Sequence, residues 1–258
     1  VVLRHFLAKY INFTVRHQNV RVISLAPTAV CDDMIKYPDR RIPVLKQITQ
    51  VPIFAPDGTL IDTPGYNAKS GIYYDNAIDI PKVADVPTGN DALNARSRID
   101  DLIRDFPFKS NSDKANWYAI CVQLFCRDMI DGPTPFYTFT SPTAGSGKGK
   151  LSNIPLILLT GNEYPTSTLS SNDEELRKMM VGKLRNADPA VVFDNVNGTI
   201  DSGVLANMLT ARTSKERLLG GNDDATSEIR LAWIATGNNL TMTQEIARRS
   251  IPISIDTN

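Results

Sequence analysis

The sequence contains few of the residues that build metal or disulfide sites. It has 2 histidines, His5 and His17, and 3 cysteines, Cys31, Cys121 and Cys126, in 258 residues. No two cysteines have the C-x-x-C spacing that is typical of zinc or redox motifs. These features argue against a zinc site or a disulfide framework, and favour reduced, mostly buried thiols.

The chain also lacks an excess of charge of either sign and any long apolar run. Lysine plus arginine number 28, and aspartate plus glutamate number 28. The overall charge therefore does not indicate nucleic-acid binding, and any basic surface is local. No run approaches the length of a membrane-spanning helix and no signal peptide is evident. We expect a cytoplasmic globular protein with no membrane partner.

The pattern of apolar residues predicts three parts. Residues 1–42 show helical spacing, and residues 43–90 show short apolar runs separated by proline and glycine turns. We interpret the first part as a helical segment and the second as a small β-rich module or linker. The basic residues of the first part are interpreted as a solvated face, with nucleic-acid contact as the alternative. Residues 91–258 alternate between strands and helices, which predicts an α/β domain with a parallel sheet.

Four local expectations follow within this third part. Asp91 is predicted to be the N-cap of a helix over residues 92–105, and the segment Phe106-Pro107-Phe108 separates that helix from a second one. A helix over residues 151–159 is expected to bend or end early at Pro155. A short strand is expected over residues 164–169.

The third part is organised around a glycine-rich turn between an apolar strand and a helix. The turn reads Thr143-Ala144-Gly145-Ser146-Gly147-Lys148-Gly149-Lys150. Gly145 and Gly147 allow the backbone to curl around a phosphate with its N–H groups pointing inward, and Lys148 adds a positive charge. The helix that follows points the positive end of its dipole at the same anion. These eight residues are therefore predicted to bind nucleotide phosphates as a P-loop.

Two positions depart from the P-loop pattern G-x-x-x-x-G-K-[ST]. Pro142 stands at the first glycine, and Gly149 stands where a serine or threonine hydroxyl normally contacts Mg²⁺. Thr143 or a water molecule is a candidate replacement for that hydroxyl. The alternative interpretation is a flexible surface loop that happens to contain lysines, but the strand before it and the helix after it favour phosphate binding.

An acidic residue follows the next buried strand. Val191-Val-Phe-Asp194 places the carboxylate at the end of an apolar run, so Asp194 is predicted to hold Mg²⁺ through water. The next residue is Asn195 rather than glutamate. Because an amide does not accept a proton, hydrolysis is expected to be slow or to use another base. Glu174 and Glu175 are candidates for that base, with helix capping as the alternative.

Two later polar segments complete the predicted catalytic set. Asn238 and Asn239 follow another strand, where an amide can sense the γ-phosphate and orient the attacking water. An ordinary Asn-Gly turn is the alternative. Arg248 and Arg249 precede the last strand and are predicted to act as arginine fingers on the nucleotide of a neighbouring subunit, with surface ion pairs as the alternative.

The order of these segments resembles the AAA+ domain of replication helicases from phages and mobile elements, of the superfamily 3-like or primase-associated type. The resemblance covers about residues 91–258, with looser similarity back to about residue 42. The segments that carry it are Gly145-Ser-Gly-Lys148, Phe193-Asp-Asn-Val196, Arg217-Leu-Leu-Gly220, Thr236-Gly-Asn-Asn239 and Arg248-Arg249.

The resemblance implies a DNA helicase or replication-initiator ATPase that uses ATP and Mg²⁺. It further implies a homo-oligomeric, hexameric ring that hydrolyses ATP between subunits and translocates on single-stranded or forked DNA in a bacterial or phage-infected cell. Nucleotide roles would fall on Lys148, Asp194, Asn238 or Asn239, and Arg248 or Arg249. Because the chain starts at Val1 rather than Met and stops just after a strand-like segment, we expect it to be part of a longer protein.

The family's DNA-contacting hairpin corresponds to residues 218–225. This segment is acidic at Asp223 and Asp224 and is flanked by Lys215 and Arg217, so these two basic residues are only weak candidates for DNA contact. Two other functions stay open beside the helicase. One is an ATP-binding oligomeric scaffold with little hydrolysis, and the other is a P-loop motor that acts on protein or in packaging.

Overall fold

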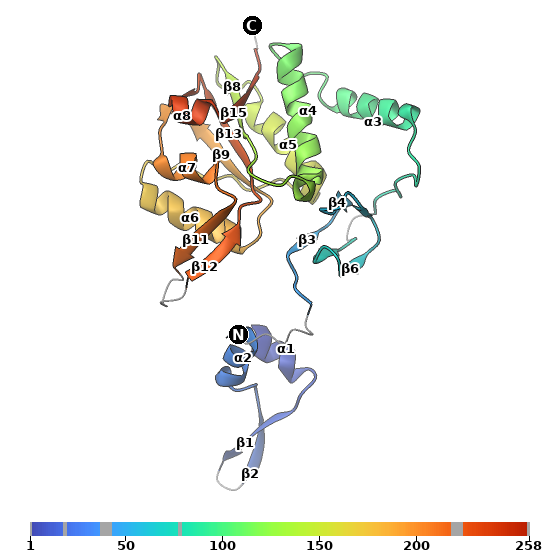
Figure 1. The fold of residues 1–258 in the computed structure, drawn as a ribbon, viewed down its shortest axis with the longest axis vertical. Helices are drawn as coiled ribbons and strands as arrows, with labels where there is room; N and C mark the ends of the chain where they lie inside the picture. Colours follow the sequence, from blue (N-terminus) through green and yellow to red (C-terminus); the bar gives the residue numbers. More distant parts are fainter. Residues whose placement is uncertain (1, 18–19, 37–42, 77–78, 218–223, 257–258) are drawn as a thin grey trace. The chain divides into compact units, whose positions relative to one another are not determined.

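The computed structural model describes residues 2–17, 20–36, 43–76, 79–217 and 224–256. The chain divides into two compact units, Val1–Val44 and Leu45–Asn258. The first unit contains, in order, α1 (Val2–Ala8), β1 (Phe13–His17), β2 (Val20–Ser24) and α2 (Thr28–Lys36) (Figure 1).

The first unit has a small core made by Leu7, Ala26 and Cys31. Its antiparallel hairpin, β1 with β2, corrects the prediction of a purely helical segment. The hairpin escaped the sequence analysis because its side chains are almost all exposed, so no buried face produces a regular apolar and polar alternation.

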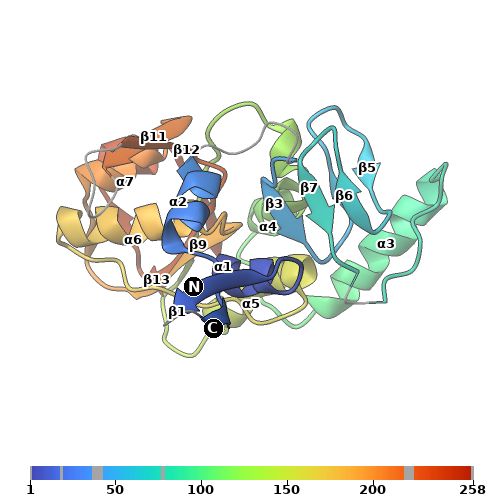
Figure 2. The same ribbon diagram turned by 90° about the horizontal axis from the view of Figure 1, so that it is seen from below.

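The second unit begins with short strands. Strands β3 (Gln47–Thr49), β6 (Gly65–Asn67) and β7 (Ile72–Tyr74) form a sheet of order β3-β7-β6, and these strands lie side by side in Figure 2. Strands β4 (Ile53–Phe54) and β5 (Leu60–Ile61) form a separate pair. The buried side chains of this region belong to the same hydrophobic cluster as the helices that follow it.

Two capped helices come next. Helix α3 (Gly89–Leu102) begins with a capping box in which Thr88 is the N-cap and Asp91 occupies the third helical position. Asp91 had been expected as the N-cap itself, so the helix starts slightly earlier than predicted. Helix α4 (Asn111–Phe125) is capped by Ser110, whose hydroxyl accepts from the N–H of Asp113. A 3-10 turn, η1 (Arg127–Met129), follows it.

A four-stranded parallel sheet forms the centre of the second unit. Its strands are β8 (Phe136–Ser141), β9 (Ala190–Val196), β13 (Ala232–Asn238) and β15 (Ser250–Ser254), in the order β15-β8-β13-β9. A single parallel bridge, Ser167 with Phe193, replaces the strand that had been expected over residues 164–169. The prediction of an α/β fold with a parallel sheet is confirmed.

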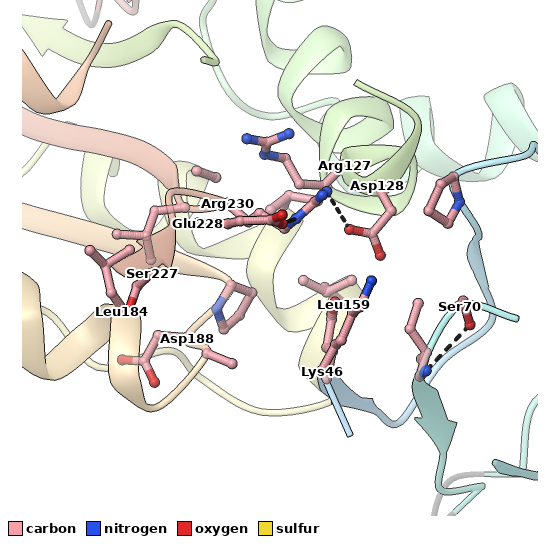
Figure 3. A pocket seen from close by; sticks show the side chains of 18 of the residues that line it. Lys46, Ser70, Arg127, Asp128, Leu159, Leu184, Asp188, Ser227, Glu228 and Arg230 are labelled. Atoms are coloured by element: carbon pink, nitrogen blue, oxygen red, sulfur yellow. Dashed lines mark hydrogen bonds and ion pairs between the residues drawn. The ribbon is translucent and has the colours of Figure 1, made fainter. Parts of the chain in front are cut away.

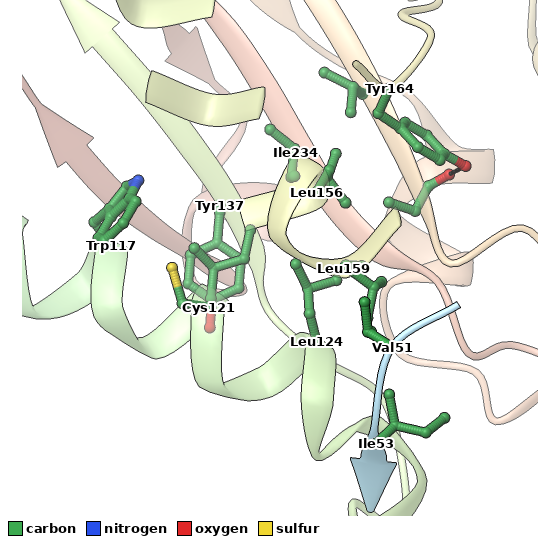
Figure 4. Close-up of a cluster of buried hydrophobic side chains, with 14 of the residues drawn as sticks. Val51, Ile53, Trp117, Cys121, Leu124, Tyr137, Leu156, Leu159, Tyr164 and Ile234 are labelled. Atoms are coloured by element: carbon green, nitrogen blue, oxygen red, sulfur yellow. Dashed lines mark hydrogen bonds between the residues drawn. The ribbon is translucent and has the colours of Figure 1, made fainter. Parts of the chain in front are cut away.

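Helices cover both faces of this sheet (Figure 1). Helices α4 and α5 (Lys148–Thr160) pack on one face, where Tyr137 and Ile234 point toward them (Figure 4). Helices α6 (Asp173–Arg185), α7 (Gly203–Met208) and α8 (Gln244–Ala247) contribute to the core on the other face, where Phe136 and Trp233 are buried. Alternate residues of β8, β9 and β13 thus enter opposite cores, as expected for strands covered on both sides.

Helix α5 continues through Pro155, where a bend or an early break had been expected. A proline at position 155 has no N–H to donate to the carbonyl of Leu151, four residues earlier. The indole N–H of Trp117 donates to that carbonyl instead, at 3.0 Å. Tertiary packing from α4 thereby satisfies the carbonyl that proline leaves free.

The remaining elements lie around the ends of the sheet. Strands β10 (Thr199–Ile200) and β14 (Thr241–Met242) form a short parallel pair. Strands β11 (Thr213–Arg217) and β12 (Asp224–Glu228) form an antiparallel hairpin. Within the described ranges, no helix is both long enough and apolar enough to cross a membrane.

Candidate functional site

The predicted site residues that follow β8, β9 and β13 lie at the carboxyl edge of the parallel sheet. All strands of such a sheet end at the same edge, and ligands of open α/β sheets bind there. The glycine-rich loop leaves β8 after Ser141 and enters α5 at Lys148. Asp194 is near the end of β9, and Asn238 ends β13, which pairs with both of the other strands.

The loop has the backbone shape that phosphate binding requires. Gly145 and Gly147 both have left-handed backbones, with φ of 72° and 87°. No atom lies within 4 Å of the position that a Cβ would take at Gly145, so this turn faces open space. A Cβ at Gly147 would lie 3.2 Å from the ring of Phe106. Ser141 supports the start of the loop, since its hydroxyl accepts from the N–H of Thr143 at 3.3 Å.

Lys148 is the cation of the site and is only 8% exposed. Its ammonium donates to Ser146 Oγ at 3.0 Å, to the Thr143 carbonyl at 3.0 Å and to Asn238 Oδ1 at 2.7 Å. These three neutral acceptors use all three ammonium protons but supply no negative charge. Burial lowers the pKa of Lys148, and the nearby carboxylate of Asp194 opposes that shift. A phosphate would supply the missing counter-charge.

Asp194 is held by a residue on the neighbouring strand. Thr236 donates its hydroxyl proton to Asp194 Oδ1 at 2.5 Å, and the same hydroxyl accepts from the N–H of Asn195 at 3.0 Å. Asn195 has a left-handed backbone with φ of 51°. Asp194 and Asn195 are both exposed, whereas Thr236 is buried. Sequence reasoning noted Thr236 only as part of a polar cluster, and a threonine in a strand carries no distinctive signal.

The first turn of α5 brings Gly149 beside this carboxylate. A Cβ at Gly149 would lie 3.7 Å from Asp194 Oδ1, so the position that usually carries a hydroxyl does face the acid that was predicted to hold Mg²⁺. The proposed substitute, Thr143, contributes its carbonyl to Lys148 and is exposed. Lys150 and Ala144 are also exposed.

The structure distinguishes between the two candidate asparagines. The side chain of Asn238 contacts the Lys148 ammonium, whereas Asn239 has a left-handed backbone, with φ of 47°, and donates its N–H to the Ser141 carbonyl at 3.2 Å. Asn238 is therefore the amide that lies at the predicted γ-phosphate position, and Asn239 shapes the strand end.

The two predicted finger residues lie at the opposite, amino edge of the sheet. The backbone carbonyl of Arg249 accepts a hydrogen bond from the N–H of Phe136, the first residue of β8. The 6 residues of β8 are joined by five steps of about 3.3 Å, so this edge is roughly 17 Å from the start of the P-loop. Glu245 pairs with both guanidiniums, at 3.6 Å for Arg248 and 3.5 Å for Arg249. Arg248 is the more accessible of the two, with 64% of its side chain exposed against 18%.

The structure tells less about the roles of the remaining candidate residues. Lys215 is exposed on β11, and Arg217 ends that strand opposite Asp224. Residues 218–223 of the expected DNA-contacting segment lie outside the described residues. Glu174 and Glu175 lie in the first turn of α6, where both pair with Lys178, at 2.9 Å and 3.2 Å. This arrangement agrees with the capping interpretation of the two glutamates.

A hollow of about 500 Å³ opens beside the glycine loop. Its lining residues are Asp105, Phe106, Pro107, Gly145, Ser146, Gly147 and Asp256. Within the described part of the chain, the buried Oδ1 of Asp256 has no hydrogen-bond partner. The sequence analysis had treated Phe106 and Pro107 only as a break between two helices, so it missed this wall of the site.

A larger cavity of about 580 Å³ includes residues that directly precede β9 and β13, at the amino edge (Figure 3). Both of its central arginines are held by contacts within the chain, one by carboxylates and the other by backbone carbonyls. Arg230 contacts Asp128 and Glu228, both at 2.8 Å. Arg127 donates to the carbonyls of Ile130, Gly132 and Ile229 at 2.9–3.0 Å. These charges stabilise the chain itself, which makes this cavity a weaker candidate than the loop.

Comparisons with known proteins give only a distant structural similarity. No family model and no curated protein sequence matches the chain. A crystal structure of the helicase of JC virus (JCV), solved with a small organic compound bound, is similar with a TM-score of 0.37 and 16% identity. The match covers 57% of this chain and 45% of the viral chain, so it spans less than half of that protein. The similarity is too low to assign an activity, and function is inferred below from the residues of this chain.

Proposed function

We propose that this chain is a P-loop ATPase that binds ATP with Mg²⁺ at the carboxyl edge of its parallel sheet. The observation that carries the proposal is the buried Lys148 ammonium, which lies in a loop of left-handed glycines at the start of a 13-residue helix and contacts no carboxylate among the described residues. A buried cation surrounded by neutral acceptors favours an anionic ligand, because only a ligand can supply its counter-charge.

Each residue of the site has a role in this proposal. The N–H groups of the glycine loop and the start of α5 bind the β- and γ-phosphates, and the ammonium of Lys148 exchanges its neutral acceptors for phosphate oxygens. Asp194 would hold Mg²⁺ or a water bound to it, and the ion would supply positive charge close to the transferred phosphoryl group. Asn238 is released from Lys148 by the incoming phosphate and becomes free to orient the attacking water.

The hollow beside the loop is proposed to hold the nucleoside. It adjoins Gly145, Ser146 and Gly147, so a nucleotide whose phosphates lie in the loop can extend into it. Phe106 offers an aromatic ring for contact with a base, and the unpaired Asp256 Oδ1 can accept from a hydroxyl or amino group. These features fit a nucleoside triphosphate better than a simple phosphate.

We further propose that the chain is the motor of a replication helicase or initiator, assembled as a ring on DNA. Arg248 is exposed and lies far from the P-loop of its own chain, so any contact of this guanidinium with a nucleotide must be made in a neighbouring subunit. The ring, its hexameric state and its DNA substrate stand as proposals. An ATP-dependent scaffold is the second candidate, and it is favoured by Asn195, an amide at the position where a proton-accepting glutamate would be expected.

ATP hydrolysis by the purified chain, measured with and without single-stranded DNA, tests the proposal. Lys148→Ala should abolish nucleotide binding or turnover, while Lys69→Ala, at an exposed lysine in the turn between β6 and β7, should leave both unchanged. DNA-stimulated turnover that is lost in Lys148→Ala supports the motor. Assembly on ATP without turnover supports the scaffold, and equal turnover in Lys148→Ala and the parent contradicts the P-loop mechanism.

A further inference from the structure

A buried hydroxyl on β13 controls the geometry of the carboxylate proposed to hold Mg²⁺. Thr236 is 3% exposed, donates to Asp194 Oδ1 and accepts from the N–H of Asn195. Water does not compete for a hydroxyl that is this deeply buried. One threonine therefore fixes both the carboxylate and the backbone that directly follows it.

The strand pairing around Thr236 is irregular, and the Thr236 hydroxyl accepts a hydrogen bond from a backbone N–H there. The pairing of β13 with β9 shifts register between Ala235 and Gly237, so Thr236 lies at the irregularity. Asn195, on the facing strand, adopts a left-handed backbone that is costly for a residue other than glycine. Its N–H donates to the threonine hydroxyl, so the side chain compensates for the disturbed pairing of the two strands.

Gly149 occupies the other position from which a hydroxyl would reach the same carboxylate oxygen. A Cβ there would have Asp194 Oδ1 at 3.7 Å as its one neighbour within 4 Å among the described residues, and the backbone of Gly149 is not left-handed. A serine would therefore fit without strain. The P-loop pattern has a serine or threonine at this position, and this chain lacks it.

We propose that Thr236 is a positioning residue for Asp194, and that its hydroxyl replaces, from β13, the hydroxyl that α5 lacks at position 149. The proposal rests on the proposed function, since it requires Mg²⁺ at Asp194. The Thr236 hydroxyl donates to Oδ1 of Asp194, whereas Oδ2 of Asp194 accepts no hydrogen bond from the described residues. Oδ2 is therefore the oxygen directed to the metal ion or to its bound water.

The test separates metal-dependent binding from nucleotide binding as such. The affinity for a fluorescent ATP analogue is measured with Mg²⁺ and with a chelator. The ratio of the two affinities is the gain in affinity due to Mg²⁺. Thr236→Val should reduce this gain by about 10- to 100-fold, as removal of a residue that orients a metal ligand does, and should leave binding in chelator unchanged. Thr236→Ser keeps the hydroxyl and should retain the gain.

A second-site change and a matched control sharpen the result. Gly149→Ser in the Thr236→Val background should restore most of the Mg²⁺-dependent gain, because it places a hydroxyl near the same oxygen. Thr134→Val serves as the control: Thr134 is 4% exposed and donates to the Leu231 carbonyl at 3.1 Å, just before β8 begins. It should lose stability but keep the gain. Should Thr236→Val not fold, Thr236→Ala removes the same hydroxyl without placing an apolar methyl group in its position.

Several outcomes overturn the proposal. These are an unchanged gain in Thr236→Val, an equal loss of gain in Thr134→Val, and a loss of gain in Thr236→Ser. Failure of the proposed function is recognised separately, because the parent chain would then show no Mg²⁺-dependent gain at all.

Discussion

Both edges of the parallel sheet carry charged groups but use them differently. At the amino edge, Arg230 contacts two carboxylates, at 2.8 Å each, and Glu245 pairs with the two arginines that precede β15. At the carboxyl edge, within the described residues, Lys148 contacts only neutral oxygens, and the side chain of Asp194 contacts a hydroxyl and not a cation.

This difference indicates which edge is built for a ligand. Charges that neutralise one another stabilise the fold and gain little from a further partner. A buried ammonium near an exposed carboxylate that it does not contact is an arrangement that an anion and a divalent cation would complete together. The larger cavity lies at the amino edge, so cavity volume alone would have selected the wrong edge.

The largest expected difference between the two edges follows from neutralising one aspartate at each. Asp194→Asn should lower ATP turnover by on the order of 100-fold, because the amide binds Mg²⁺ poorly. Asp128→Asn should leave turnover unchanged and cost about 1 kcal/mol of stability, through its lost pair with Arg230. Turnover and urea unfolding are measured on both variants. An equal loss of turnover in the two would show that the edges are not functionally distinct.

Adding a methyl group at a glycine tests how tightly the carboxyl edge is packed. A Cβ at Gly237 would lie 2.4 Å from Leu240 Cδ2 and 2.5 Å from the Val196 carbonyl oxygen, so Gly237→Ala should destabilise the chain by about 1–3 kcal/mol. Gly182, exposed on α6 with open space around it, is the control. Gly182→Ala should stabilise by about 0.5–1 kcal/mol. Chemical denaturation measures both, and a neutral Gly237→Ala would contradict the close approach of the two strands.

The pH dependence of nucleotide binding tests the role of the Lys148 ammonium at the carboxyl edge. Burial lowers the pKa of Lys148 from 10.5, so the ammonium loses its proton at a lower pH than an exposed lysine. Affinity for the nucleotide should therefore fall as the pH rises, beginning below 10.5. Because the unfolded chain holds this proton more tightly, stability without ligand should increase with pH in the same window. Titration of binding against pH measures the first effect, and an affinity that stays constant to pH 10.5 would contradict it.

The smallest expected effect concerns two thiols near the amino edge. Burial raises the pKa of Cys121 to about 12 and also raises the pKa of the more accessible Cys126, which directly precedes η1. Iodoacetamide should modify Cys126 faster than Cys121 at pH 8, since the thiolate is the reactive form. Mg²⁺ with ATP should leave the ratio of the two rates unchanged, as the nucleotide binds at the other edge. Mass spectrometry of tryptic peptides measures both rates.

Much of the central fold was predictable because each strand and helix has a local signal. The apolar run before Asp194 is a strand buried on both faces, and the glycine-rich turn does join a strand to a helix. The β1 and β2 hairpin was missed because exposed strands show no buried face. The continuation of α5 through Pro155 was missed for another reason, since the partner of the Leu151 carbonyl is Trp117, 34 residues away.

The sequence by itself determined which residues meet at one edge of the parallel sheet, because the order of strand, loop and helix brings Lys148, Asp194 and the two asparagines there. Only the tertiary structure decided their finer roles. The register of β13 against β8 brings Asn238, rather than Asn239, to Lys148, and the irregular pairing with β9 brings the Thr236 hydroxyl to Asp194. These contacts join residues 42 to 90 positions apart, and no local propensity encodes a hydrogen bond across that separation.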